Sequence, residues 1–406
     1  MLRNLTSQSR WCYSKRFVRK PKYSAPPEWL ESATTFKDAH TVLTDPHSPL
    51  PYPTEQLRSY LHKTEVEEKL RKKQKVLRPK RHVLNFDHIP IQEQCVALFP
   101  GQGAQFVGMG KELMKIKQCQ EIYEQANQIL GYDLAKICLE GPKTKLDQTI
   151  YCQPAIFVSS MAALQKLRLD APELDERFTE SAGFSVGEFA ALVLAGILKF
   201  EDALKIIDVR ARAMHECNQK VYSGMVTVKV NASSELEKAI KEAREQALEE
   251  GELPICEVAN YLYSGVKVVG ASKLCIEFLK QNAERFNYQV VKDLEVSGAF
   301  HTVLMSPAEQ ALKDVLKDIE LCPARMNVYS NYTGKVYPHK PSKIRENIIK
   351  QVSSTVKWEQ IMQLLYRKHK DYEFPEFFEI GPGKQLGVIL YYISKKAHKH
   401  YNQVSC

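Results

Sequence analysis

The sequence contains no apolar run long enough to cross a membrane. Its longest apolar stretch free of charged residues, from Phe189 to Leu198, is only 10 residues long, whereas a membrane-spanning helix needs about 20. We therefore expect neither a transmembrane helix nor a membrane partner. With 406 residues, of which 44% are hydrophobic, the chain is long enough for one large globular domain and a smaller one.

The cysteines lack the pairing that zinc sites and redox motifs require. Ten cysteines are scattered singly, with no Cys-x-x-Cys pair and no histidine at zinc-ligand spacing. Unpaired thiols of this kind are typical of a reducing compartment, and the mitochondrial matrix is one that fits. We expect no metal and no other cofactor.

Acidic residues are absent from the first 27 positions, which carry seven Lys or Arg residues. Because the formal net charge of the chain is +9, the rest of it is only about +2, and we expect no nucleic-acid partner. An acid-free N-terminus with arginines and serines is typical of a mitochondrial transit peptide, which we assign to residues 1–27. A basic arm that binds nucleic acid is the alternative. Residues 28–90, rich in proline and charge, are expected to form a solvated arm with an exposed or interacting helix from Glu65 to His82.

A glycine-rich loop follows the first predicted buried strand (96–99), but it lacks the residues that a phosphate cradle needs. Gly103 and Gly108 have P-loop spacing, yet Met109 stands where the lysine belongs. The dinucleotide fingerprint fails as well, because Phe106 replaces its third glycine. The pattern excludes a phosphate-binding loop of either kind.

A serine flanked by glycines gives the strongest indication of chemistry. Gly183, Ser185 and Gly187 have the spacing of the nucleophile elbow, a sharp strand-to-helix turn that exposes the central side chain. Glycines two positions before and after the serine keep Cβ atoms out of the crossing of the two elements. Ser185 is therefore the candidate nucleophile.

A serine nucleophile needs a base, most often a histidine that follows it in the chain. We set aside the histidines in polar or lysine-rich stretches, His339, His369, His398 and His400. His215 is expected on a helix from Asp202 to about Asn218, as a surface or structural residue. His301 lies in a loop between two predicted elements, where catalytic residues concentrate. It is the candidate base.

The oxyanion of an acyl-transfer transition state needs hydrogen-bond donors, and the loss of one costs about 10²- to 10³-fold in rate. The backbone N–H of Val186 is one candidate donor, and that of Gln102, between two glycines of the earlier loop, is the second. Arg210 and Arg212 lie on the helix after the elbow helix. Most helix arginines are solvated, but one that points into the pocket would bind a substrate carboxylate through two parallel hydrogen bonds.

Strands alternate with helices on both sides of an internal block, which favours an α/β fold. The block begins with a strand at 225–230 and a helix that we expect to be capped by Ser233 or Ser234, with Leu248 on its apolar stripe and its end at Gly251. The elements that follow are a strand at 254–258, a strand at 266–270, a helix at 272–286 and a strand at 288–296. The order β-α-β-β-α-β is that of a ferredoxin-like unit.

This order divides the compact fold into three stretches. We predict a first part of a large α/β domain at 91–220, a ferredoxin-like small subdomain at 221–296, and the second part of the large domain at 297–406.

Motifs that follow one another in register resemble those of the malonyl-CoA:acyl carrier protein transacylases, most closely their mitochondrial members. They are FPGQGAQ (99–105), GFSVGEFAAL (183–192), VRARAM (209–214), SGAFH (297–301) and GPGKQLG (381–387). The likeness covers about residues 94–395. It implies an α/β-hydrolase-like core with the ferredoxin-like insert, in agreement with the order of elements above.

The resemblance implies an acyl transfer in two halves that feeds mitochondrial fatty acid synthesis. Ser185, activated by His301, would take the malonyl group from malonyl-CoA, and the phosphopantetheine thiol of acyl carrier protein would then remove it. The coenzyme A thioester is a substrate, and no cofactor is implied. Gln102 and Val186 would supply the oxyanion hole, and Arg210 would hold the free malonyl carboxylate.

Further positions follow from the same resemblance. The backbone carbonyl of Gln351 would orient the histidine, so the site would be a Ser-His dyad with no carboxylate as third member. Gln153 would line the pocket, and Phe300 would crowd out a methyl-branched acyl group. Phe184 replaces the histidine that precedes the nucleophile in most of the wider family, which places more of the carboxylate recognition on the arginine.

Two other functions would use the same residues differently. A serine hydrolase, such as a thioesterase or esterase, would share the elbow but release the acyl group to water. The lack of an HGGG-type loop and of a well-placed Asp before His301 counts against it. A non-catalytic binding module would keep its function without the Ser185 hydroxyl.

Overall fold

The computed structural model of the protein describes residues 83–294, 296, 298–367 and 373–406. The expected transit peptide, most of the expected arm with its helix from Glu65 to His82, and His369 lie outside the described residues. No helix in the described ranges is both long enough and apolar enough to span a membrane.

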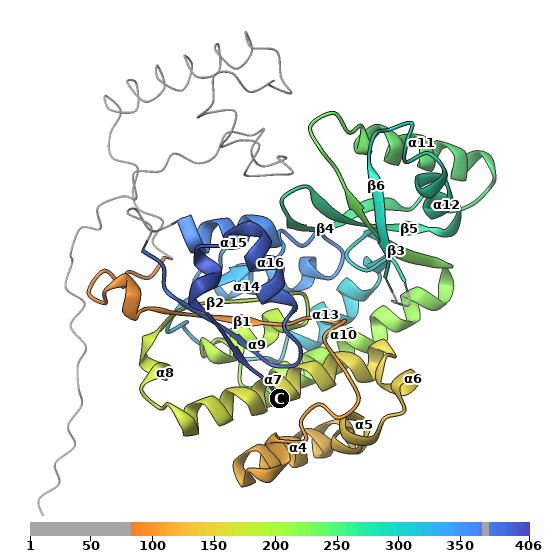
Figure 1. Ribbon diagram of the computed structural model, residues 1–406. Coiled ribbons are helices and arrows are strands. Elements are labelled where there is room, and N and C mark those ends of the chain that lie inside the picture. Colours follow the sequence, from red (N-terminus) through yellow and green to blue (C-terminus); the bar gives the residue numbers. More distant parts are fainter. Residues whose placement is uncertain (1–82, 295, 297, 368–372) are drawn as a thin grey trace, which may run out of the picture.

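A six-stranded sheet forms the centre of the larger part (Figure 1), with the strand order β10-β9-β1-β2-β7-β8. Its strands are β1 (Cys95–Phe99), β2 (Phe178–Gly183), β7 (Asn327–Ser330), β8 (Lys335–Val336), β9 (Glu376–Ile380) and β10 (Tyr401–Val404). Neighbouring strands run parallel, except for the antiparallel pair β7 and β8. The carboxyl ends of β1, β2, β7 and β9 therefore meet at one edge, where α/β proteins usually bind their ligands.

Both faces of this sheet are covered by helices, and β1 shows why. Its side chains alternate between the faces: Cys95, Ala97 and Phe99 belong to one apolar cluster, and Val96 and Leu98 to another. The first cluster includes residues of α7 (Thr149–Asp170), α9 (Gly187–Leu194) and α10 (Phe200–Lys220). The second includes residues of α15 (Trp358–Arg367) and α16 (Gln385–Ile393). A continuous apolar run is what a strand buried on both faces requires.

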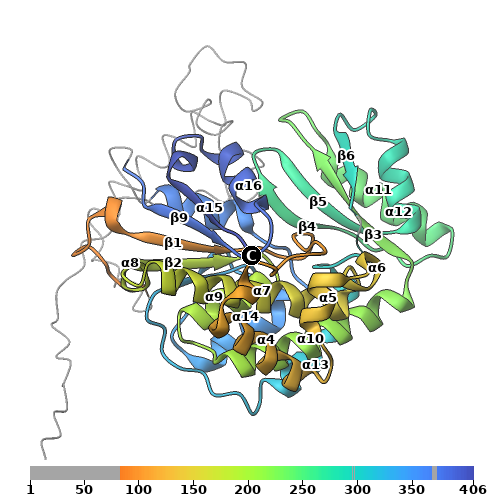
Figure 2. The same cartoon turned by 60° about the horizontal axis from the view of Figure 1, so that its bottom comes forward.

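Further helices complete the larger part. The α-helices are α4 (Lys117–Leu130), α5 (Leu134–Glu140), α6 (Lys143–Leu146), α8 (Leu174–Arg177), α13 (Ala308–Val315) and α14 (Pro341–Gln351). The 3-10 helices are η1 (Ile91–Glu93), η2 (Leu113–Lys115), η3 (Val303–Met305) and η5 (Ala397–His400). Figure 2 shows α4, α7, α10 and α13 stacked below the large sheet.

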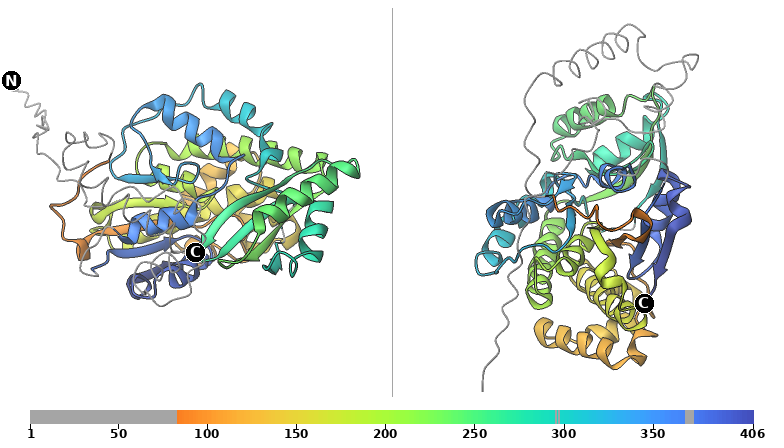
Figure 3. Two further views of the ribbon diagram at one scale, coloured as in Figure 1. Left: turned by 90° about the horizontal axis from the view of Figure 1, so that it is seen from above. Right: turned by 90° about the vertical axis from the view of Figure 1, so that its left-hand side faces the viewer.

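A second, four-stranded sheet lies beside the larger part in both views of Figure 3. Its elements follow the order β3 (Ser223–Lys229), α11 (Leu236–Glu249), β4 (Cys256–Tyr263), β5 (Val266–Ser272), α12 (Lys273–Gln281) and β6 (Gln289–Asp293). The sheet order is β4-β5-β3-β6 and all pairs are antiparallel, as in a ferredoxin-like unit. The α/β class with an inserted β-α-β-β-α-β unit is confirmed; where each of the three stretches begins and ends stays a prediction.

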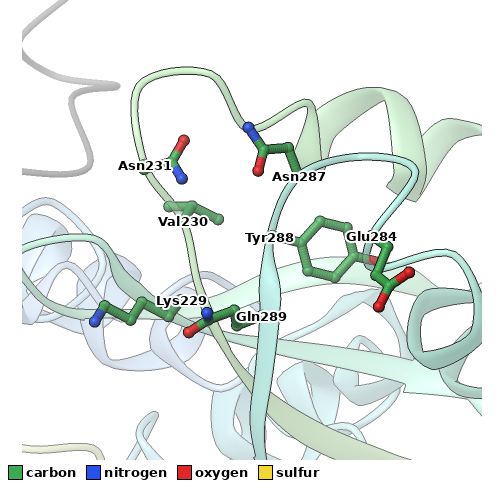
Figure 4. Close-up of a pocket in the computed structure, with 7 residues that line it drawn as sticks. All are labelled: Lys229, Val230, Asn231, Glu284, Asn287, Tyr288 and Gln289. Atoms are coloured by element: carbon green, nitrogen blue, oxygen red, sulfur yellow. The ribbon is translucent and has the colours of Figure 1, made fainter.

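Two details predicted for the first helix of this unit are wrong. Neither Ser233 nor Ser234 caps α11, which has no side-chain cap. The Ser234 hydroxyl donates to the Asn287 carbonyl instead, and Asn287 donates to Ser233, because the turn before α11 packs on the loop after α12. Leu248 is 61% exposed, so the apolar stripe ends at Ala247, which is buried. Figure 4 shows a surface pocket at these loops, lined by Lys229, Val230, Asn231, Glu284, Asn287, Tyr288 and Gln289.

Other element boundaries differ by a few residues. The helix predicted at 272–286 ends at Gln281, and the strand predicted at 288–296 is β6, which ends at Asp293. The strand predicted at 254–258 continues to Tyr263. The helix that carries the arginines is longer at both ends than predicted. Element ends are the least certain part of a pattern-based prediction, since end residues lack the full set of hydrogen bonds.

Candidate active site

The predicted elbow lies between β2 and α9, at the carboxyl edge of the large sheet. Ser185 has a φ of 53°, in the left-handed region that residues with a side chain rarely adopt. A Cβ atom added to Gly183 would lie 2.0 Å from the Gly187 carbonyl carbon, and one added to Gly187 would lie 2.3 Å from the Phe99 carbonyl oxygen. Only glycine fits at these two positions, as the sequence pattern predicts.

Ser185 and His301 meet, although 116 positions separate them. The Ser185 Oγ lies 2.8 Å from His301 Nε2, and the two residues are 8% and 4% exposed. His301 Nδ1 lies 2.9 Å from the Gln351 backbone oxygen. Because a carbonyl can only accept, Nδ1 carries the proton and Nε2 is free to accept the hydroxyl proton. His301 has a φ of 59°, so both residues of the pair are held in an uncommon backbone conformation.

His301 is neutral in the resting site. Burial, and to a smaller extent the positive charge of Arg210, lower its pKa to about 3. The imidazole therefore carries no proton on Nε2 at neutral pH and can act as a base without first losing one.

Arg210 is the largest buried polar side chain beside this pair. It is 1% exposed, and its Nη2 donates to Ser185 Oγ at 3.1 Å and to Gln351 Oε1 at 2.8 Å. Its Nη1 donates to Gln153 Oε1 at 2.6 Å. Burial lowers the pKa of Arg210 to about 10, while the negative charge of Glu188 opposes this shift. The guanidinium stays charged at neutral pH.

Arg212 has no place in the site. Its side chain is about half exposed and pairs with Asp208 one turn earlier on α10. Residues two positions apart lie on different faces of a helix, which separates the roles of Arg210 and Arg212. His215 is likewise excluded: it lies on α10 and bonds to Gln219, as expected for a helix-surface histidine.

The two candidate oxyanion donors lie in neighbouring loops. The Phe184 N–H donates to the Phe99 carbonyl at 2.9 Å, and a Cβ added to Gly101 would lie 2.5 Å from the Phe184 oxygen. Gln102 follows directly in this loop. Among the residues that the structure describes, neither the Val186 nor the Gln102 backbone N–H donates to a protein acceptor. Both are available to a substrate oxygen.

The two phenylalanines of the resemblance occupy different surroundings. The ring of Phe184 packs edge-on against Trp358, with centroids 5.5 Å apart. The ring therefore packs into the apolar cluster between the large sheet and α15. Phe300 precedes His301 and is buried in the same apolar cluster as Met214 and Val268.

Sequence reasoning missed three residues that surround the elbow. Asn331, directly after β7, accepts from the Ser185 N–H at 2.7 Å. Glu188, in the first turn of α9, is 1% exposed and accepts from the Asn331 N–H at 2.9 Å. Tyr337 donates to the same carboxylate. The only local indication was an acidic residue inside the otherwise apolar run that starts at Val186.

In the parts of the chain that the structure describes, no three His, Cys, Asp or Glu side chains are grouped so that they could hold a metal ion. The pocket of Figure 4 contains none of the candidate site residues. The chemistry available at the elbow is therefore that of a serine, a neutral histidine, a buried cation and free backbone donors.

The α/β fold, with an elbow serine, a histidine within hydrogen-bond reach of it and unpaired N–H groups nearby, has the features of a serine-dependent acyl-transfer enzyme. Comparison with known proteins identifies the family. Residues 96–382 match the acyl transferase domain. The mitochondrial malonyl-CoA-acyl carrier protein transacylase of Mus musculus is 44% identical over 313 residues, which cover 77% of this chain and 82% of that protein. The chain belongs to the malonyl-CoA-acyl carrier protein transacylases of the acyl transferase family.

Solved structures agree with this result. The malonyl-CoA-acyl carrier protein transacylase of Clostridium perfringens has a TM-score of 0.68 and 29% sequence identity, and the match covers 77% of this chain and 93% of that one. A malonyl transacylase in complex with a polyketide acyl carrier protein has a TM-score of 0.66 at 25% identity, covering 76% of this chain and 94% of that one.

Proposed function

We propose that the protein transfers the malonyl group of malonyl-CoA to the phosphopantetheine thiol of acyl carrier protein through a malonyl ester on Ser185. One observation carries the proposal: the buried Arg210 guanidinium lies 3.1 Å from the same Ser185 Oγ that lies 2.8 Å from His301. A cation beside the nucleophile suits an acyl group that ends in a carboxylate.

In the first half-reaction the Ser185 Oγ attacks the thioester carbonyl while its proton passes to His301 Nε2. The negative oxygen of the tetrahedral intermediate accepts from the Val186 and Gln102 N–H groups. When the intermediate collapses, the carbon–sulfur bond breaks and coenzyme A leaves as a thiol with the proton from the imidazole. The Gln351 carbonyl keeps the ring oriented, since it accepts a hydrogen bond from the Nδ1–H group throughout.

The second half-reaction reverses these steps with a different thiol. The thiol of acyl carrier protein gives its proton to His301 and attacks the ester carbonyl on Ser185. The same donors stabilise the second intermediate, the ester bond to Oγ breaks, and the imidazole returns the proton to the serine. No cofactor takes part in either half.

Arg210 selects the acyl group. Its Nε is buried and, within the described part of the chain, has no hydrogen-bond partner, so the resting guanidinium does not use all its donors. The malonyl carboxylate would replace Ser185 Oγ as the acceptor of Nη2, while Gln153 and Gln351 keep the guanidinium plane in place. Phe300 would restrict the space for branched acyl groups.

We place the reaction in the mitochondrial matrix, where it supplies fatty acid synthesis. The mitochondrial name of the mouse relative and the acid-free segment 1–27 support this compartment. We also propose that residues 28–90 are an N-terminal arm, whose described end contacts the large domain where the Leu84 backbone bonds to the Asn327 side chain. Residues 221–296 would act as one small subdomain between the two parts of the large domain, 91–220 and 297–406.

Intact-mass measurement after brief incubation with malonyl-CoA tests the proposal. We expect one malonyl adduct, localised by proteolysis to Ser185, that disappears when acyl carrier protein is added. Ser185→Ala should give no adduct, whereas Ser181→Ala, which changes a buried serine on the strand that leads to the elbow, should give a normal one. Release of free malonate that is as fast without acyl carrier protein as with it would instead identify a serine hydrolase.

A further inference from the structure

Glu188 is a buried carboxylate that the mechanism above does not use. It lies in the first turn of α9 among apolar residues and is 1% exposed. Its Oε1 accepts from the Tyr337 hydroxyl, and its Oε2 accepts from the Asn331 N–H at 2.9 Å and from Gln351 Nε2 at 3.2 Å. Burying a carboxylate costs free energy unless it is paired, so its position calls for a physical explanation.

Its two amide partners hold the Ser185 peptide on both sides. Asn331 Oδ1 accepts from the Ser185 N–H at 2.7 Å, and Asn331 Nδ2 donates to the Gly183 carbonyl at 2.8 Å. Gln351 Nε2 donates to the Ser185 carbonyl at 2.8 Å. Since Ser185 has a left-handed φ of 53°, these contacts maintain a backbone conformation that a residue with a side chain rarely adopts.

Gln351 also connects Glu188 to the other reacting side chains. Its Oε1 accepts from Arg210 Nη2 at 2.8 Å, and its backbone oxygen accepts from His301 Nδ1. The amide therefore lies between the buried carboxylate and the buried guanidinium, with one hydrogen bond to each. A displacement of Gln351 would disturb the nucleophile, the base and the carboxylate-binding cation together.

We propose that Glu188 is a positioning residue of the acyl-transfer site, which acts through Asn331 and Gln351 to fix the Ser185 peptide and to orient Arg210. The inference rests on the proposed function, because it assigns Glu188 a role in that same reaction. A purely structural carboxylate would affect folding alone, whereas a positioning residue also affects the rate of the chemical step.

The ionisation of Glu188 gives this role a pH signature. Burial raises its pKa to about 7, and hydrogen bonds from Tyr337, Asn331 and Gln351 together with the charge of Arg210 oppose the shift. The titratable groups that face it are Tyr337, whose own pKa is raised by burial and by the carboxylate, and Arg210. Burial holds the pKa of His301 far below this range, so an inflection near pH 7 in the acylation rate that disappears in Glu188→Gln would report the ionisation of Glu188.

The experiment compares full-length Glu188→Gln and Glu188→Ala with the parent enzyme. The matched control is Glu180→Gln, which changes another buried carboxylate that bonds to a tyrosine and an asparagine, Tyr329 and Asn327. Single-turnover malonylation of Ser185 is measured between pH 5.5 and 9 by intact mass, together with acetylation by acetyl-CoA, and thermal unfolding reports on folding.

Glu188→Ala should lower the maximal acylation rate for both acyl groups by about 10²-fold, as expected when a reacting group is misplaced. Glu188→Gln can keep its oxygen toward Asn331 and Gln351, so it should retain the rate within about fivefold but lose the inflection near pH 7. Glu180→Gln should retain both rate and inflection. An inflection that persists in Glu188→Gln, or a folded Glu188→Ala with the parent rate, would overturn the proposal.

The proposed function can fail separately from this inference. If the parent enzyme forms no malonyl-serine at all, the malonyl transfer is wrong. If the parent forms it normally and the Glu188 variants lose activity only in proportion to their unfolded fraction, the positioning role alone is refuted.

Discussion

Arg210→Ala should change the choice of acyl group more than it changes catalysis. The substitution removes a fully buried guanidinium with hydrogen bonds to Gln153, Ser185 and Gln351. In the proposed reaction, Arg210 and the malonyl carboxylate form a buried, hydrogen-bonded charge pair. Removal of one partner of such a pair costs about 2 to 5 kcal/mol. This corresponds to a fall of about 30- to 5,000-fold in kcat/KM for malonyl-CoA.

The same substitution should affect acetyl-CoA much less, because an acetyl group offers no carboxylate to the guanidinium. Two smaller effects oppose each other. The amides of Gln153 and Gln351 lose a partner, which costs rate, while the pKa of His301 rises once the positive charge beside it is gone, which strengthens the base. We expect the acetylation rate of Ser185 to change by less than about tenfold. The ratio of the malonylation rate to the acetylation rate should therefore fall by nearly as much as the malonylation rate itself.

The assay is single-turnover acylation of Ser185 with each thioester, followed by intact mass. Arg212→Ala is the control, because Arg212 lies on the same helix but is exposed and pairs with Asp208; it should leave both rates at the parent value. Equal losses for malonyl-CoA and acetyl-CoA in a folded Arg210→Ala protein would refute the reasoning, because they would show that Arg210 acts on catalysis and not on the carboxylate.

Two further predictions concern stability. Gly183→Ala places a Cβ atom 2.0 Å from the Gly187 carbonyl carbon, so the elbow must open, and chemical denaturation should show a loss of unfolding free energy above about 4 kcal/mol; a loss below about 1 kcal/mol would contradict the close crossing. The pKa of His301 falls from its usual 6.5 to about 3 on folding, so the unfolded chain binds more protons between these pH values and stability is lost as pH falls through this window. In this window the parent should lose up to about 5 kcal/mol of unfolding free energy relative to His301→Gln. Glu188, whose pKa rises on folding, has the opposite effect, but this effect is common to both proteins. Parallel curves of unfolding free energy against pH for the two proteins would refute this explanation.

The sequence allowed the elbow and its histidine to be predicted because their requirements are local. Two glycines flank Ser185 where a strand and a helix cross, and their spacing in the sequence reflects that close approach. His301 could be chosen because the other histidines lay in helical or strongly polar surroundings. The β-α-β-β-α-β order was also accessible, since each element has its own periodicity of apolar residues.

Asn331 and Glu188 could not be found in this way. The hydrogen bond between the Ser185 N–H and Asn331 spans 146 positions, and the one between Asn331 and Glu188 spans 143. An asparagine in Ser-Asn-Tyr-Thr-Gly is typical of a turn, and a glutamate in a first helical turn is typical of a surface helix. Only the parallel order of β2 and β7, a tertiary property, brings both to the same edge of the sheet.

His301 Nδ1 donates its hydrogen bond to the Gln351 backbone carbonyl and not to a carboxylate. A neutral acceptor suits a site whose substrate is an anion. A carboxylate there would make a stronger base, but it would also add a negative charge beside the malonyl group. Two unit charges about 6 Å apart repel by about 3 kcal/mol at an effective dielectric constant of about 20. The Gln351 carbonyl fixes the same tautomer without that charge. The site does contain one carboxylate, that of Glu188. The Gln351 side-chain amide lies between it and Arg210, so Glu188 is separated from the substrate by this amide and by the guanidinium. Arg210 thus stays attractive to the malonyl group, while the base remains neutral and oriented.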